Sequence, residues 1–272
     1  MKRFAAAALL LAACHSCQHQ GTPGDSVHEP VKPKRALDEK KVRAAIAHAA
    51  KWMAQFPPAD LRFDAAIGLT AIRARQSDPA LDESLKHARE VADKDGDNPL
   101  RPLFDADAGS TPSVWEVPDA GRVNVNRVLA EAVGCASNGI RPAVLDYASG
   151  PMRDQGGFQT THALWALSLA RDRGCLPRAE FNRRAGPLVA ELRSAHSNVP
   201  GPTVQDLDLY AERALMLELA GVHDDQVTLW LEKLLDAQAK DGAWGPAGGN
   251  DPPYYRFHST MAASWALAEA LP

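Results

Sequence analysis

The chain has 272 residues, with 30 Lys and Arg against 34 Asp and Glu and a formal net charge of −4. This acidic balance argues against a nucleic-acid partner, which needs a basic surface. Apolar residues make up 45% of the chain, enough for one large domain or two small ones, and no stretch of eighteen apolar residues predicts a membrane-spanning helix.

The first fourteen residues predict export. Lys2-Arg3 precedes an apolar run from Phe4 to Ala13, which is too short to span a bilayer and is typical of a signal peptide. Leu11-Ala12-Ala13-Cys14 resembles the lipobox of bacterial lipoproteins. In that family the cysteine thiol is diacylated, the peptide is cut just before it, and the new amino terminus is acylated. An ordinary secretory signal cleaved near Cys14 is the alternative.

The resemblance implies that residues 1–13 are removed and that Cys14 carries the lipid that anchors the protein in the membrane. His15 follows Cys14, where the inner-membrane retention signal of lipoproteins would have Asp. Lipoprotein sorting therefore implies the outer membrane. Residues 14–36 are rich in Gln, His, Gly, Pro and charge, and we expect them to form a flexible tether.

Beyond the tether, residues 37–272 carry helical patterns, and alternating strand patterns are absent. Apolar residues recur three or four positions apart in seven segments, namely Val42–Phe56, Phe63–Ile72, Val125–Val133, His162–Ala170, Leu207–Leu219, Leu229–Ala237 and His258–Leu271. The predicted fold class is all-α.

Several of these helices share an opening, in which an apolar residue or Thr precedes a polar residue and an Ala/Leu-rich turn. The polar members are Asp64, Asn126, His162, Asp208 and His258. Most spacings are close to 49 residues or to twice that number, whereas Asn126 falls late, after a long Asp/Pro/Gly segment around residues 95–121. A period of this length suits one helical hairpin per repeat.

A second recurring element precedes these openings. It is clearest in Gln238-Ala239-Lys240-Asp241-Gly242-Ala243-Trp244-Gly245, and Asp154-Gln155-Gly156-Gly157-Phe158 is its relative. Glycine ends a helix at low cost because it accepts the left-handed conformation, and we expect the following aromatic residue to fill the gap between hairpins.

This element resembles the repeat of squalene–hopene cyclases and protein prenyltransferase β subunits. The resemblance implies an α/α toroid of about five hairpins around a central cavity, either closed or as an incomplete ring. A non-closing helical array is the alternative. The Asp-x-Asp-Asp motif of the cyclases is missing, since the chain offers only Asp206-Leu207-Asp208-Leu209.

In a toroid, the five polar residues named above would form a ring at one mouth of the cavity. Asp64, Asn126 and Asp208 could instead cap helix starts. His162 and His258 could act as acid/base groups or as ligands of a zinc-like ion. We assign neither a metal nor a cofactor from the sequence.

The loop before His258 adds Tyr255 and Arg256, residue types that recognise glycans or carboxylates by stacking and bidentate hydrogen bonds. A rigid loop lip would explain the same residues. Among the tryptophans, which we interpret mainly as core, Trp115 and Trp244 are the better candidates for a ligand wall. Cys135 and Cys175 form either a disulfide, which persists outside the cytoplasm, or two buried thiols.

Three functions follow. The leading hypothesis is a lipid-anchored envelope protein whose cavity binds a glycan or peptide without turnover. The alternative is an enzyme acting on a polysaccharide, with His162, His258, Tyr255 and Arg256 as acid/base and substrate-positioning residues. The third is a structural scaffold for other envelope proteins.

Overall fold

The computed structural model describes residues 36–94, 98–105, 107–108, 125–197, 199–248 and 251–272. All regular secondary structure in these ranges is helical, which confirms the predicted all-α class. The described helices belong to one compact unit of the chain, Lys32–Pro272. The predicted signal peptide, the lipid site Cys14 and nearly all of the tether lie outside the described residues.

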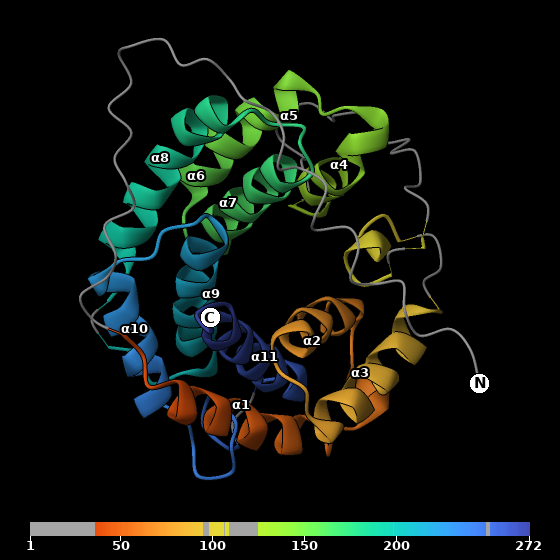
Figure 1. Cartoon of the computed structure of the whole chain (residues 1–272), viewed down its shortest axis with the longest axis vertical. Helices are drawn as coiled ribbons and strands as arrows, with labels where there is room; N and C mark the ends of the chain where they lie inside the picture. Colours follow the sequence, from red (N-terminus) through yellow and green to blue (C-terminus); the bar gives the residue numbers. More distant parts are fainter. Residues whose placement is uncertain (1–35, 95–97, 106, 109–124, 198, 249–250) are drawn as a thin grey trace. The chain divides into compact units, whose positions relative to one another are not determined.

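Figure 1 shows the helices in their order along the chain. In order they are α1 (Glu39–Met53), α2 (Phe63–Arg75), α3 (Pro79–Ala92), α4 (Val125–Asn138), α5 (Pro142–Tyr147), α6 (Arg153–Gln155), α7 (Gly157–Asp172), α8 (Arg178–Ala195), α9 (Val204–Leu219), α10 (Asp225–Asp236) and α11 (Pro253–Glu269). Two short 3₁₀ helices, η1 (Pro58–Asp60) and η2 (Arg101–Leu103), and a short π-helix, η3 (Ala148–Met152), complete the described elements. None of these helices has the length and apolar composition needed to cross a bilayer.

The seven predicted helical segments fall on α1, α2, α4, α7, α9, α10 and α11. The apolar pattern of the sequence did not predict α3 and α8. Helix α3 has a clear start, because Asp78 accepts a hydrogen bond from the Ala80 N–H at 2.8 Å and Pro79 occupies the first helical position. Helix α8 is harder to recognise, since it contains Pro187, a residue that disfavours helix interiors, and few of its residues are buried.

Five helices form a continuous packing series. Helix α2 packs on α11, α11 on α9, α9 on α7, and α7 on α4. A second set packs around the outside of this series, with α3 on α2, α1 on α11, α10 on α9 and α8 on α7 (Figure 1). The five helices of the first series therefore have neighbours on several sides, and α9 and α11 bury residues over most of their surface.

Small residues allow the helices of the series to approach closely. Gly68 of α2 faces Met261 of α11, and a Cβ atom at position 68 would overlap the Met261 side chain. Helix α11 also buries Ala262, Ala263 and Ala266. This close packing gives each helix of the series a fixed position relative to its neighbours.

The segment Gln238–Gly245 joins α10 to α1 and α11. The Gln238 amide donates hydrogen bonds to the backbone carbonyls of Ala45, at 2.9 Å, and Gly242, at 2.8 Å. Trp244 is fully buried, and its indole N–H donates to the Leu234 carbonyl at 2.7 Å. The predicted gap-filling role therefore holds for Trp244.

The same prediction is wrong for Phe158, whose side chain is 37% exposed. Phe158 already lies in the first turn of α7, whereas Trp244 precedes α11 by a loop that can fold back onto the core. The two copies of the element therefore differ in what their aromatic residue contacts.

Cys135 and Cys175 are joined by a disulfide, with 6.1 Å between their Cα atoms. Cys135 lies near the end of α4, and Cys175 lies in the loop between α7 and α8. The sequence allowed a disulfide or two buried thiols, and the structure shows the disulfide. It links the end of α4 to the loop between α7 and α8.

Candidate functional site

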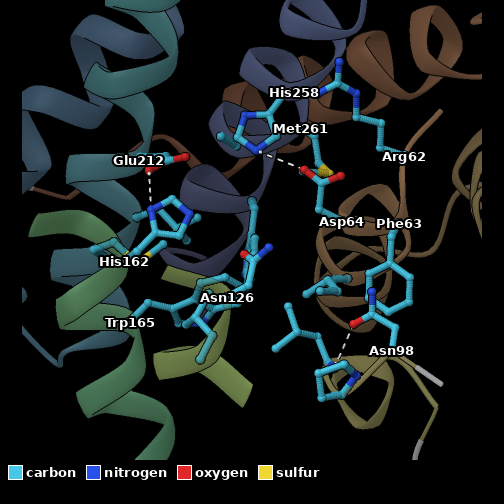
Figure 2. A pocket seen from close by; sticks show the side chains of 18 residues that line it. Arg62, Phe63, Asp64, Asn98, Asn126, His162, Trp165, Glu212, His258 and Met261 are labelled. Carbon is cyan, nitrogen blue, oxygen red and sulfur yellow. Dashed lines mark hydrogen bonds and ion pairs between the residues drawn. The ribbon is translucent and has the colours of Figure 1, made fainter. Parts of the chain in front are cut away.

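A cavity of about 360 Å³ lies between the helices of the packing series. Side chains from α2, α4, α7, α9 and α11 line it, together with Arg62 and the segment 98–100 (Figure 2). Five segments that are far apart in the sequence thus contribute to one site.

The structure brings together the five polar residues that the repeat singled out. Asp64, Asn126, His162 and His258 line the cavity. Asp208 does not line it, but its carboxylate Oδ1 accepts a hydrogen bond from His258 Nδ1 at 2.8 Å. The equivalence inferred from the spacing therefore corresponds to proximity in space.

Capping does not explain the two aspartates. Helix α9 begins at Val204 and is capped by Thr203, which forms a reciprocal capping box with Asp206. Asp208 therefore lies a full turn inside the helix. Asp64 lies in the first turn of α2 but is held by the hydroxyl of Tyr254, which donates a hydrogen bond to its Oδ1.

His258 lies between two carboxylates. Its Nδ1 contacts Asp208, and its Nε2 lies 3.5 Å from Asp64 Oδ2 (Figure 2). Burial alone would lower the pKa of His258. The charges of Asp208, Asp64 and Glu212 and the hydrogen bond to Asp208 outweigh burial and raise this pKa to about 10. The imidazole is therefore a fixed positive charge at neutral pH in the free protein.

Glu212 is a site residue that the sequence analysis missed. It follows Asp208 by four residues, so both carboxylates lie on the same face of α9. Glu212 is only 4% exposed and accepts a hydrogen bond from the Thr161 hydroxyl at 2.6 Å. Burial and the charge of Asp208 raise the pKa of Glu212, whereas His162 and His258 act in the opposite direction.

His162 lies beside Glu212 on one side of the cavity (Figure 2). Its Nδ1 lies 3.7 Å from Glu212 Oε2 and 2.7 Å from the Phe158 carbonyl oxygen. Because a carbonyl oxygen only accepts, Nδ1 carries the proton and donates to Phe158. In this tautomer the acceptor lone pair of the imidazole is on Nε2.

The remaining wall is largely apolar. Trp165 and Trp265 both line the cavity and pack edge to face, with ring centroids 5.8 Å apart. The sequence analysis favoured other tryptophans: Trp244 instead belongs to the core, and Trp115 lies outside the described residues. Phe63, Met216 and Met261 extend the apolar surface.

Tyr255 and Arg256, predicted to position substrate, do not line the cavity. The Arg256 guanidinium instead donates to the Gly245 carbonyl at 2.9 Å and forms an ion pair with Asp241 at 2.9 Å. It therefore holds the Gln238–Gly245 segment in place, as the loop-lip alternative expected. The neighbouring Tyr254 contacts the site, through Asp64.

A cation also stands at the mouth of the cavity. Arg62 lines it, and the Arg62 guanidinium lies 4.6 Å from the ring centroid of Tyr254. The cavity thus has a positive group beside α2 and a cluster of histidines and carboxylates on the side of α7, α9 and α11. Within that cluster, Asp208, Glu212 and His258 each offer a ligand atom within 4.8 Å of the others.

Neither the protein-family models nor the curated proteins nor the solved structures with which the chain was compared match it. The function is therefore argued from the site itself.

Proposed function

We propose that this chain is a lipid-anchored protein of the bacterial cell envelope and that its helices form an α/α toroid whose cavity binds an envelope glycan or peptide. The lipobox-like segment ending at Cys14 supports the anchor and an outer-membrane location. The residues that line the cavity support the ligand class.

The packing order supports the toroid. Helices α2, α11, α9, α7 and α4 pack in series and all contribute to the cavity, while α3, α1, α10 and α8 pack outside that series. Alternation between cavity-lining and covering helices is what repeated helical hairpins produce when they curve around a centre. In this arrangement α2 and α4 are the two ends of the series.

The observation that carries the binding proposal is the division of the cavity into an aromatic wall and a polar mouth. Trp165 and Trp265 offer flat apolar surfaces on which a sugar ring or an apolar side chain stacks. Arg62, Asn126 and His162 present polar groups that suit hydroxyl, amide or carboxylate groups of the same ligand. Such a combination of apolar lining and a few convergent polar groups is typical of ligand sites.

The test is titration of the full chain with disaccharide peptides released from peptidoglycan by a muramidase, with chito-oligosaccharides and with free stem peptides. Calorimetry measures affinity. We expect one class to bind, and Trp165→Leu to weaken it by about tenfold or more, which corresponds to a loss of at least about 1.4 kcal/mol. Trp52→Leu is the control, because Trp52 is also half-buried but packs on Phe56 and Phe257 and does not line the cavity. Binding of no probe, or equal weakening by both variants, would contradict the proposal.

The second candidate is an acid–base enzyme acting on the same ligand. Two observations favour it. Burial raises the pKa of Glu212, as an acid catalyst requires. The neighbouring His162 has its acceptor nitrogen, Nε2, available. Mass spectrometry of the same incubations separates the two functions. Cleaved products that disappear with Glu212→Gln, while binding persists, identify an enzyme; an unchanged ligand identifies a binding protein.

A further inference from the structure

Two acidic side chains are buried side by side on α9. Asp208 and Glu212 are 7% and 4% exposed and lie one turn apart on the same face of the helix. Two buried carboxylates in this relation repel each other unless a cation lies close to both. His258, from the neighbouring helix α11, contacts Asp208 directly.

The cluster is richer in carboxylates than in cations. Asp64 also reaches His258, on the opposite ring nitrogen, so that two carboxylates share one imidazole. Glu212 Oε2 accepts from the Thr161 hydroxyl and lies 3.7 Å from His162. Its second oxygen, Oε1, has no hydrogen-bond partner among the described residues, and Glu212 lines the cavity. This oxygen is not itself buried, so the cavity gives a ligand access to it.

We propose that Asp208, Glu212 and His258 bind a divalent transition-metal ion, Zn²⁺ or Mn²⁺, in the wall of the cavity. One ligand atom of each residue lies within 4.8 Å of the other two. An ion with bonds of about 2.1 Å holds its ligand atoms about 3.0 to 3.4 Å apart, so the widest separation between the ligand atoms has to shorten by about 1.5 Å around it.

The residue types select the ion. Imidazole together with carboxylate oxygen suits Zn²⁺ and Mn²⁺, whereas Mg²⁺ and Ca²⁺ prefer oxygen ligands alone. On binding, the ion takes the place of the proton on His258 Nδ1, which now points at Asp208 Oδ1, and that proton goes to solvent. His258 Nε2 keeps its proton and its contact with Asp64, which then orients the imidazole as an outer carboxylate partner.

Only three protein ligands surround the proposed ion, so a coordination position stays open. Because Glu212 and His258 line the cavity, we infer that this position faces the cavity and takes water or an oxygen atom of a ligand. The inference does not depend on the proposed glycan or peptide ligand, since the ion is measured without one.

The experiment is a calorimetric titration of the metal-stripped full chain with ZnCl₂ and, separately, with MnCl₂ and MgCl₂. Histidines of the tether can bind Zn²⁺ too, so the readout is the difference between matched proteins. We expect Glu212→Gln and Asp208→Asn each to lose one bound equivalent of Zn²⁺ or Mn²⁺, or to bind it at least tenfold more weakly, and Mg²⁺ to show no such difference. Asp236→Asn is the control, because this exposed residue at the end of α10 has no part in the cluster.

Circular dichroism verifies that each variant is folded. Where a neutral variant fails to fold, Asp208→Glu replaces it, because it keeps the charge but moves the carboxylate. Equal stoichiometry and affinity for the parent chain and the folded cluster variants would overturn the proposal. So would a parent chain that binds neither Zn²⁺ nor Mn²⁺.

Discussion

At the scale of single residues, His196 differs from the ionisable groups of the cavity because it is buried in the core. His196 follows α8, and its ring stacks on Trp230 with 3.7 Å between ring centroids and lies 4.1 Å from the ring of Tyr210. Burial lowers the pKa of His196 to about 4. The hydrogen bond to the Ser197 carbonyl acts against this shift, and the charge of Arg213 adds to it. His196 is therefore neutral in the folded protein at physiological pH.

This histidine predicts a loss of stability in mild acid. Its pKa in the unfolded chain is about 6.5, so between pH 6.5 and 4 the unfolded state binds a proton that the folded state excludes. The free energy of unfolding then falls as the pH is lowered through that window, by about 3 kcal/mol in total. Urea unfolding at several pH values measures it.

His196→Phe is the matched control, because it keeps a stacking ring and removes the titrating group. Carboxylates titrate in both proteins, so the difference between the two pH profiles reports His196 alone. Parallel profiles for the two proteins would show that His196 does not titrate as the structure indicates.

The candidate site shows which residues a sequence reveals. Asp64, Asn126, His162, Asp208 and His258 were found because the repeat places them at equivalent positions. Glu212 could have been found as well, since a charged residue four positions after Asp208 falls on the same helix face within an apolar segment. The pairing of His258 with both Asp208 and Asp64 was out of reach, because it depends on how three helices pack.

At the scale of elements, the Gln238–Gly245 segment behaves as a structural joint. Gly242 has a φ of +95°, and a Cβ atom there would lie 2.6 Å from the backbone oxygen of His48 in α1. Both the backbone conformation and the close approach to α1 therefore require glycine.

We expect Gly242→Ala to lower the free energy of unfolding by more than about 2 kcal/mol, because strain and overlap with α1 add. Gly248→Ala is the matched control: its φ is +81°, but no atom lies within 4 Å of the added Cβ, so only the strain of about 1 kcal/mol remains. Denaturant unfolding of both variants provides the comparison. Equal losses would mean that contact with α1 contributes nothing.

The apolar pattern predicted the helices that are rich in apolar residues and missed α3 and α8, which are the poorest in them among the longer helices. The segments found on α1, α9 and α11 have dense apolar patterns. Helix α8 buries only Phe181, Ala185, Leu188 and Leu192, and most of its other residues are polar. A helix that contacts the rest of the protein along so narrow a stripe leaves a weak pattern in the sequence.

At the scale of the whole described unit, the disulfide is the one covalent link between distant described segments. Cys135 and Cys175 are 40 residues apart. A cross-link over a loop of this size stabilises the folded state mainly by restricting the unfolded chain, typically by about 2–4 kcal/mol.

We therefore expect the double variant Cys135→Ser/Cys175→Ser to unfold at lower urea concentration, with a loss of about 2–4 kcal/mol. Reduction of the parent chain should produce a similar loss, whereas reductant should leave the stability of the variant unchanged. An unfolding midpoint that neither treatment moves would show that the link does not constrain the unfolded chain.

The repeat period indicated hairpins and the equivalence of their first turns, but not the order in which the helices pack. That order depends on side-chain contacts such as those between α9 and α11, which bury small and large residues together. Sequence spacing alone contains no such information. The closure of the series between α2 and α4 therefore stays a prediction.

The contact between Gly68 and Met261 has a consequence for how such a protein can change over generations. Met261 lines the cavity, whereas Gly68 does not, and any side chain at position 68 would displace the Met261 thioether. A single mutation at a position that does not line the cavity is thus expected to change the shape of the cavity. Evolution can then change which molecules fit the cavity through substitutions at position 68, without substitutions in the polar cluster.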